Sequence, residues 1–422
     1  MKLNQDKIGK FIAAMRKRKG ITQRDLAEQL GISDKTVSKW ECGKGMPDNV
    51  LMLPLCDILQ ISANELLSGE QIYSMQDAEN NISQLLEETE LRKRRYMFQE
   101  QYGLEIETIE RTKMGAGAVV YIATCKDGRY IIKYASENSM NHPELEAPIC
   151  TYLQKYGIPT CPFIRNRQGE YLSADENGRL YSVQLFHNGK TYGYHEAPEW
   201  LMVQSAQMLG RIHKALKSYE QVPIGIGEDY FTYMPLENAR KSYEKSIIIA
   251  KTNGDTAIVE DLEYRIGLMK RFEKREIDFA RLTCQASHGD YIINQLICGE
   301  EHIHAVIDWS TCCIQPVAWE IFRSFAYASP NCKDGEIDVE QLLSYVSYYL
   351  QYATLNKYDL EMMPYLFYYQ SAVCDYYGQY YASIMDSRKV YLEQAVFSTK
   401  LLSWLEKNLE QLSHILCSKI DL

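Results

Sequence analysis

The sequence predicts a multidomain protein in which a small all-α helix-turn-helix domain precedes a larger α+β domain built as two lobes. Three observations lead to this fold class. The chain has 422 residues, enough for two or three domains of ordinary size. Apolar residues recur with a helical period over residues 1–70 and with a strand period over about residues 102–134. Beyond Pro198 the pattern is mainly helical again.

Composition and charge exclude several classes of protein. With 46% hydrophobic and 24% charged residues, the chain is typical of a folded protein rather than a disordered one. No run of about 18 apolar residues and no apolar leader occur, so we expect neither a membrane span nor secretion but a cytoplasmic protein. The 12 cysteines include no Cys-x-x-Cys pair, which argues against a zinc site or a disulfide framework.

The net charge of −10 argues against one broad nucleic-acid-binding surface. Residues 1–70 nevertheless carry 11 basic and 9 acidic residues, so the negative excess belongs to the rest of the chain. A basic module can therefore occupy the N-terminal part.

Five short helices are predicted in residues 1–70. The first carries an apolar stripe and ends near Gly20, and Thr22-x-x-Asp25 opens the second, which stops at Gly31. The third runs from about Ser33 to Glu41. Pro47 is expected to open the fourth, and Ser62-x-x-Glu65 caps the fifth.

The third helix carries the function of this domain. It turns Val37 and Trp40 inward and short polar or basic residues outward, which suits a helix that enters the major groove of DNA. The pattern resembles the Xre family of phage-repressor-like helix-turn-helix domains at Thr22–Ala27, Leu30–Ser33, Thr36–Glu41 and Gly43–Pro47. The resemblance implies that the DNA contacts are made by Gln23 and Lys44 on phosphates and by Lys35, Thr36, Ser38 and Lys39 in the groove. It also implies a homodimer on double-stranded DNA.

Residues 71–100 are predicted to form a helical linker, with a dimer contact as the alternative role, and its basic cluster, Arg92–Arg95, is expected on a solvated face. A lobe with an antiparallel sheet and a helix follows over residues 101–190, and a mainly helical lobe over residues 191–422. The strands are predicted at 105–112, 117–124, 128–134, around 171 and at 181–185, with a two-strand island at 295–308.

Phosphoryl transfer requires a cover for the phosphates, a cation, metal ligands and a carboxylate that orients the acceptor. Gly115 and Gly117 lie between two predicted strands, and Lys133 ends the next strand. Asp290 follows a Gly turn, and Asp308 ends a predicted strand 18 positions later. One carboxylate suits a base and the other a magnesium ligand.

The larger domain resembles the aminoglycoside phosphotransferase family, whose fold is protein-kinase-like, from about residue 104 to 400. The resemblance is carried by Leu209–Lys214, Ser287–Asp290, Val306–Trp309 and Pro316-x-x-Trp319-Glu320. It implies that Asp290 is the catalytic base, that Asp308 is the main magnesium ligand, and that Lys133 binds the phosphates of the nucleotide, which is ATP or GTP.

Two assignments stay open within this resemblance. The family's asparagine ligand falls at Gln295, with Asn294 one position earlier, and either amide can bind Mg²⁺. Glu146 is implied as the partner of Lys133. Because Pro148 is expected in the first helical turn, Glu144 is a rival.

The acceptor pocket is less defined by sequence. A tyrosine-rich stretch at 365–381 has helical spacing, and most of its rings are expected to pack. Glu320, Asp375 and Tyr376 are the candidates for binding a cationic or hydroxylated acceptor. His213 is expected to be a core residue.

The sequence and its resemblances thus favour a DNA-binding regulator fused to an ATP-dependent phosphotransferase, which transfers the γ-phosphate to a hydroxyl of an aminoglycoside-like or other small metabolite. The alternative is a regulator whose larger domain senses nucleotide or another ligand without catalysis.

Overall fold

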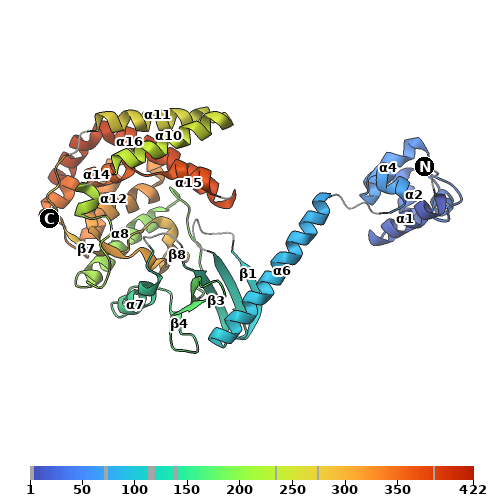
Figure 1. Cartoon of the computed structure of the whole chain (residues 1–422), viewed down its shortest axis with the longest axis horizontal. Coiled ribbons are helices and arrows are strands. Elements are labelled where there is room, and N and C mark those ends of the chain that lie inside the picture. The colour runs from blue at the N-terminus through green and yellow to red at the C-terminus, as the bar shows by residue number, and fades with distance from the viewer. Residues whose placement is uncertain are drawn as a thin grey trace. The chain divides into compact units, whose positions relative to one another are not determined.

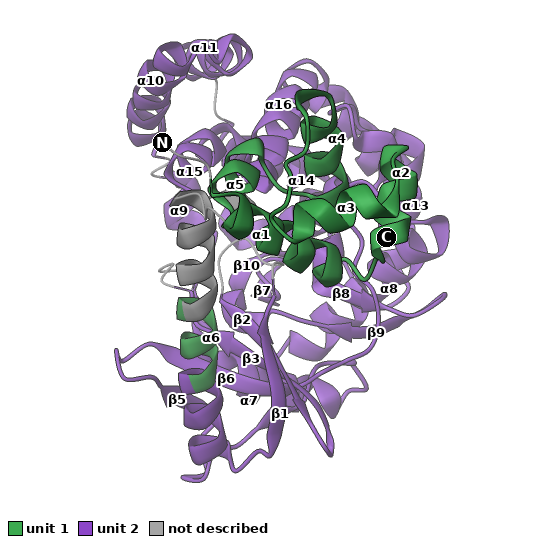
Figure 2. Cartoon of the chain, turned by 90° about the vertical axis from the view of Figure 1, so that its right-hand side faces the viewer, with its two compact units in different colours: residues 1–92 green, residues 93–422 purple. Residues whose placement is uncertain are grey.

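The structure is a computed structural model that describes residues 4–70, 75–112, 119–136, 141–232, 235–272, 275–383 and 385–422. The chain divides into two compact units, Met1–Arg92 and Lys93–Leu422, shown in different colours in Figure 2.

The first unit contains the five predicted helices. They are α1 (Gln5–Arg18), α2 (Gln23–Leu30), α3 (Asp34–Glu41), α4 (Asn49–Leu59) and α5 (Ala63–Ser68). Thr22 and Ser62 form the expected capping boxes. The start of α4 differs from the prediction, because Asp48 rather than Pro47 caps it, accepting hydrogen bonds from the backbone of Val50 and Leu51.

The core of this unit fixes α3 against the other helices. Val37 and Trp40 are buried with the apolar residues of α1, α2, α4 and α5. Arg16 of α1 holds the end of α3 through two hydrogen bonds to Glu41, of 2.6 and 3.0 Å. Both side chains are nearly buried, at 10% and 6% exposure. The orientation of α3 therefore depends on a buried ion pair.

Arg16→Ala is expected to lower the free energy of opening of α1 and α3 by about 3 kcal/mol, because Glu41 keeps a buried charge without its partner. Hydrogen exchange of the full chain measures this. Lys10→Ala is the control, since the Lys10–Asp6 pair is exposed and contributes well under about 1 kcal/mol. Equal exchange in the two variants would contradict the prediction.

The same pair gives a pH dependence. Burial opposes the charge of Glu41, yet Arg16 and Gln23 hold the pKa of Glu41 below its ordinary value. The stabilisation is therefore complete above the pKa of the unfolded chain and is lost as the pH falls through the lowered folded value.

The second unit begins within α6 (Met75–Tyr102), which continues into a six-stranded antiparallel sheet (Figure 1). The strands are β1 (Ile106–Arg111), β2 (Val120–Cys125), β3 (Gly128–Tyr134), β4 (Phe163–Ile164), β5 (Leu172–Ala174) and β6 (Leu180–Leu185). Their order is β1-β2-β3-β6-β4, and β5 also pairs with β6. The three strands expected first are thus the first three of the sheet.

The last turns of α6 cover one face of this sheet. Phe98 is fully buried and its ring lies 6.2 Å from that of Tyr121 and 5.0 Å from that of Tyr181. Arg94 stacks over Tyr134 at 4.8 Å and pairs with the buried Asp175 at 3.2 Å. The prediction that the whole basic cluster is solvated is therefore wrong at Arg94, whose side chain is only 11% exposed and lies against the buried ring of Tyr134.

Helices make up most of the rest of the second unit. They are α7 (Pro143–Gln154), α8 (Glu199–Leu216), α9 (Glu228–Thr232), α10 (Leu236–Asn253), α11 (Thr256–Arg271), α12 (Val317–Ala328), α13 (Val339–Leu350), α14 (Lys357–Ala372), α15 (Tyr376–Ala382) and α16 (Met385–Lys419). Short 3-10 turns lie at Phe279–Arg281, Ile293–Gln295, Trp309–Thr311 and Pro330–Cys332.

Two small strand pairs lie among these helices. β8 (Leu296–Cys298) pairs with β9 (Ile303–Val306), as the sequence predicts. β7 (Cys284–Ser287) pairs with β10 (Cys313–Pro316), a pair that the sequence analysis missed. Together they bring the segment after β7 next to the segment after β9. Among the described residues, no helix is both long and apolar enough to cross a membrane.

Candidate active site

Lys133 lies on the face of the sheet that α6 does not cover. Side chains alternate along β3, so the burial of Ile132 and Tyr134 on the α6 side places Lys133 on the other side. Its Nζ lies 2.8 Å from Oε1 of Glu146 in α7 and 2.6 Å from Oδ1 of Asp308. The structure thus brings together three residues that the sequence assigns to one site.

Pro148 does not displace Glu146 from α7. The first turn of that helix is opened by Pro143, and Pro148 lies inside the helix. Glu146 is buried and also accepts a hydrogen bond from the backbone of Trp309 at 3.1 Å. The rival Glu144 is exposed and lies 3.3 Å from His142 instead. The expected position of Pro148 in the first turn was wrong because Pro143 already fills it.

Charge in this cluster is unbalanced, with one ammonium group between two carboxylates. Burial opposes the charge of Lys133, but Glu146 and Asp308 raise the pKa of its ammonium group. Burial likewise opposes ionisation of Asp308, whereas Lys133 lowers the pKa of that carboxyl. Burial raises the pKa of Glu146. A site with more carboxylates than cations is suited to an additional cation.

Asp290 is held at the turn that follows β7. Gly289 adopts φ +87°, and a Cβ at this position would collide with the carbonyl of Thr311. Only glycine fits such a left-handed, closely approached position without strain. Glu320 of α12 fixes the turn, because its Oε1 accepts hydrogen bonds from the backbone of Gly289 at 2.7 Å and of Tyr291 at 3.4 Å.

Both oxygens of the Asp290 carboxylate have neighbours. Gln295 donates its amide Nε2 to Oδ2 at 3.2 Å. Nη1 of Arg323, on α12, lies 2.6 Å from Oδ1. The side chain of Asp290 remains 32% exposed, so solvent can reach it. Sequence reasoning missed Arg323, although its position three residues after Glu320 on one helix was a usable signal.

The two amides that compete as metal ligands differ in their contacts. Gln295 donates a hydrogen bond from Nε2 to the carboxylate of Asp290. Oδ1 of Asn294 is buried and accepts no hydrogen bond from any residue in the described ranges. Such an atom is costly unless it meets a donor or a cation. The contacts of Asp308 with described residues all use Oδ1. Asp308, Asn294 and Gln295 thus carry the kind of oxygen atoms that Mg²⁺ prefers as ligands.

The remaining predicted site residues of this unit have other surroundings. Gly115 and Gly117 lie outside the described residues. Glu320 is fully buried and pairs with His213, so it does not line an open surface. Asp375 caps α15 by accepting from the backbone of Gly378 at 3.0 Å. Tyr376 is the exception, because its hydroxyl lies 3.4 Å from that of Tyr327, beside Arg323.

The predicted DNA contacts lie on and around α3. Lys35, Lys39 and Lys44 are exposed, and Thr36 and Ser38 are partly exposed. The hydroxyl of Thr36 lies 2.9 Å from that of Ser33. Gln23 donates its amide to Glu41 at 2.7 Å. The three lysines thus form an accessible basic surface, whereas Gln23 is held by the domain itself.

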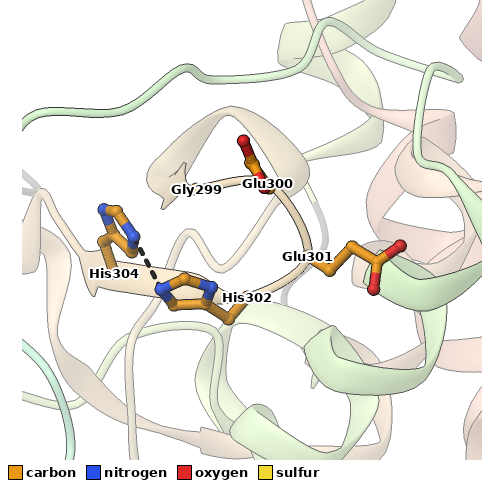
Figure 3. Close-up of a pocket in the computed structure, with 5 residues that line it drawn as sticks. All are labelled: Gly299, Glu300, Glu301, His302 and His304. Atoms are coloured by element: carbon orange, nitrogen blue, oxygen red, sulfur yellow. Dashed lines mark hydrogen bonds between the residues drawn. The ribbon is translucent and has the colours of Figure 1, made fainter.

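A pocket at the turn between β8 and β9 lies apart from the predicted residues. It is lined by Gly299, Glu300, Glu301, His302 and His304, and Figure 3 shows the two imidazoles facing each other. Their Nε2 atoms are 2.8 Å apart. In the described part of the chain, no group of three or more His, Cys, Asp or Glu residues is arranged to hold a metal ion. This pocket contributes no group to the Lys133 and Asp290 clusters.

Comparison with known proteins separates the same two units. A helix-turn-helix profile matches residues 12–66, and the profile of the phosphotransferase enzyme family matches residues 108–355. The HTH-type transcriptional activator BcrR of Enterococcus faecalis is 39% identical over 66 residues, which cover 16% of this chain and 32% of that protein. The chain therefore spans about a third of the length of BcrR. The uncharacterized HTH-type transcriptional regulator YazB of Bacillus subtilis is 40% identical over 63 residues, 15% of this chain and 91% of YazB.

Solved structures match the second unit. The amicoumacin kinase hAmiN, solved with AMP-PNP, Ca²⁺ and Ami, aligns with a TM-score of 0.51 and 14% identity over 76% of this chain and 93% of that chain. An aminoglycoside phosphotransferase from Alicyclobacillus acidocaldarius aligns with a TM-score of 0.50 and 14% identity, over 74% and 95%. At this level of identity the likeness shows the fold, which confirms the predicted kinase-like architecture.

Proposed function

This chain belongs to the phosphotransferase enzyme family, and on that premise we propose that its second unit transfers the terminal phosphate of ATP or GTP to a hydroxyl group of a small molecule. The observation that carries the proposal is the meeting of Lys133 with Glu146 and Asp308, beside a loop that presents Asp290. These are the cation, metal ligand and base that phosphoryl transfer requires.

Asp290 acts on the acceptor. Its carboxylate accepts the proton of the acceptor hydroxyl while the acceptor oxygen forms a bond to the γ-phosphorus. The bond between that phosphorus and the bridging oxygen breaks, and the nucleoside diphosphate leaves with the electron pair. Its 32% exposure supports this role, since an acceptor can reach the carboxylate.

Lys133 and Glu146 act on the nucleotide. In this proposal the ammonium group of Lys133 pairs with the non-transferred phosphates; its hydrogen bond to Glu146 of α7, at 2.8 Å, supports that role by holding the side chain in place. Asp308 and Asn294 would hold Mg²⁺, with Gln295 as the alternative to Asn294. When bound, that ion offsets the negative charge of the phosphates.

Two structural neighbours supply candidates for the acceptor. One is named an amicoumacin kinase and the other an aminoglycoside phosphotransferase. The test is to incubate the full chain with Mg-ATP or Mg-GTP and aminoglycosides, amicoumacin, amino alcohols or sugars. The expected result is a product that has gained one phosphoryl group. The absence of both thermal stabilisation by a Mg-nucleotide and a phosphorylated product would contradict the proposal.

The first unit is proposed to bind double-stranded DNA through α3, as a homodimer. The observation in favour is the exposed set of Lys35, Lys39 and Lys44 on a domain that matches the helix-turn-helix profile. Lysines on a groove-binding helix pair with phosphates and position the helix. The chain is thus proposed to be a DNA-binding regulator fused to a phosphotransferase.

The double variant Lys35→Ala/Lys39→Ala is expected to bind a mixed-sequence duplex at least tenfold more weakly. Each lost phosphate contact should also lower the slope of log K against log salt by about one. Fluorescence anisotropy at several salt concentrations measures both. Lys251→Ala is the control, because that exposed lysine lies in the second unit. An unchanged salt slope in the double variant would contradict the proposal that α3 binds DNA.

A further inference from the structure

Arg323 is a nearly buried cation beside the proposed base. Its side chain is 12% exposed and projects from α12 between Asp290 and several aromatic rings. The guanidinium lies 5.3 Å from the ring of Tyr327 and 5.6 Å from that of Trp319. Burial opposes its charge, but Asp290 raises the pKa of Arg323, so the guanidinium is positive.

The donors of this guanidinium are not saturated. Nη1 lies 2.6 Å from Oδ1 of Asp290, yet its N–H groups do not point along a hydrogen bond to that oxygen. Nη1 is buried and, apart from this ion pair, makes no directed hydrogen bond to a described residue. A guanidinium has five donors in a planar fork that suits a carboxylate or phosphate. The arrangement therefore leaves capacity for an anionic group.

Tyr194, Tyr327 and Tyr376 lie around this position. Tyr194 and Tyr327 have ring centroids 5.2 Å apart, and the hydroxyls of Tyr327 and Tyr376 are 3.4 Å apart. Gln394 of α16 donates to the hydroxyl of Tyr194 at 2.5 Å. Their hydroxyls can donate to an anion as well.

The acidic residues expected to attract a cationic acceptor are committed elsewhere. Glu320 is fully buried on His213 and the backbone of Gly289. Asp375 accepts from the backbone of Gly378 and from the hydroxyl of Ser242. The charged side chain that remains next to Asp290 is therefore the cationic Arg323.

We propose that Arg323 selects the acceptor: the proposed phosphotransferase takes a hydroxyl compound that also carries a carboxylate or phosphate group. The inference rests on the proposed function. The anionic group of the acceptor pairs with Arg323 and draws the guanidinium away from Oδ1 of Asp290. That oxygen is then free to accept the proton of the acceptor hydroxyl, so the charge of the acceptor prepares the base.

The test measures binding and turnover separately, with matched pairs of probes that differ in one carboxylate. Gluconate is compared with glucitol, and glycerate with glycerol, by titration calorimetry on the full chain in the presence of a non-hydrolysable ATP analogue. The wild-type chain is expected to bind the carboxylate member of each pair at least tenfold more tightly. Arg323→Gln should lose this preference, because a charge-assisted hydrogen bond contributes about 10- to 100-fold.

Asp290→Asn provides a second, opposite signal. Removing the internal carboxylate frees Arg323, so this variant should bind gluconate more tightly than wild type, by roughly threefold or more. Arg240→Gln is the control, since Arg240 forms exposed pairs within α10. A guanidinium that merely supports the fold would produce no gain of affinity in Asp290→Asn.

Besides the absence of a gain in Asp290→Asn, four outcomes overturn the inference. One is equal binding of both members of each pair by the wild-type chain. Another is a preference that persists in Arg323→Gln. The third is a loss of nucleotide affinity in Arg323→Gln, which would place the guanidinium on the phosphates of ATP. Phosphorylation of kanamycin at the same rate by wild type and Arg323→Gln would refute the inference while supporting the proposed function. Arg323-dependent binding of gluconate without phosphorylation of any acceptor would do the reverse.

Discussion

Asp290→Asn is expected to reduce phosphorylation of the acceptor by about a thousandfold while leaving nucleotide binding in place. Asparagine keeps the size of the side chain and an oxygen that can accept the hydrogen bond from Gln295. It cannot take a proton from the acceptor hydroxyl, and general base catalysis is worth about 10²- to 10⁴-fold. The rate is measured with whichever acceptor and nucleotide give turnover in the wild-type chain.

Asp334→Asn is the matched control for this variant. Asp334 is 88% exposed and its pairing with Lys400, at 3.5 Å, is loose. Its replacement should leave the rate unchanged. Thermal stabilisation by Mg-ATP should persist in Asp290→Asn, because Lys133 and Asp308 are untouched. Full turnover in Asp290→Asn would remove Asp290 as the base, and a loss of nucleotide stabilisation would show damage beyond the base.

The sequence predicted the elements of the fold where local signals were strong. Period-two alternation located β2 and β3, and capping boxes at Thr22 and Ser62 marked helix starts. The β7–β10 pair was missed because each strand has four residues and they are separated by the loop that holds Asp290. Short strands joined across a long segment carry no local pattern.

The candidate site was predicted to a similar extent. Lys133 and Asp308 are 175 positions apart in the chain. The resemblance nevertheless assigned them and Glu146 to one site, and the structure brings all three side chains together. The surroundings of the acceptor were not predictable, because they depend on which acidic groups the fold uses internally. Glu320 illustrates this, since only its burial against His213 shows that it is unavailable to an acceptor.

Glu320→Ala is expected to destabilise the second unit by about 4 kcal/mol, because the change removes one partner of a fully buried network. An ionised carboxylate only accepts hydrogen bonds, so Nε2 of His213 donates to Oε2 of Glu320 at 3.0 Å. The backbone N–H groups of Gly289 and Tyr291 donate to Oε1. Alanine would leave these donors buried without an acceptor and would release the turn that presents Asp290.

The pH dependence of stability distinguishes a charged network from simple packing. Burial opposes ionisation of Glu320, but His213, His288 and the backbone of Gly289 hold its pKa below the ordinary value. A lowered folded pKa contributes stability above the unfolded pKa of about 4.3, and this contribution disappears as the pH falls through the folded value. Urea unfolding of the wild-type chain should therefore show an acid limb that Glu320→Ala lacks.

Glu340→Ala, at the exposed start of α13, is the control and should change stability by less than about 0.5 kcal/mol. If Glu320→Ala unfolds at the same urea concentration as Glu340→Ala, the carboxylate does not anchor the turn. If stability falls as expected, the folded fraction of Glu320→Ala should also turn over acceptor more slowly than wild type. The reason is that Asp290 then lies on a turn without its anchor, and misplacing a base by about 1 Å costs roughly a hundredfold in rate. Stability and catalysis would thus depend on one buried carboxylate that never meets the substrate.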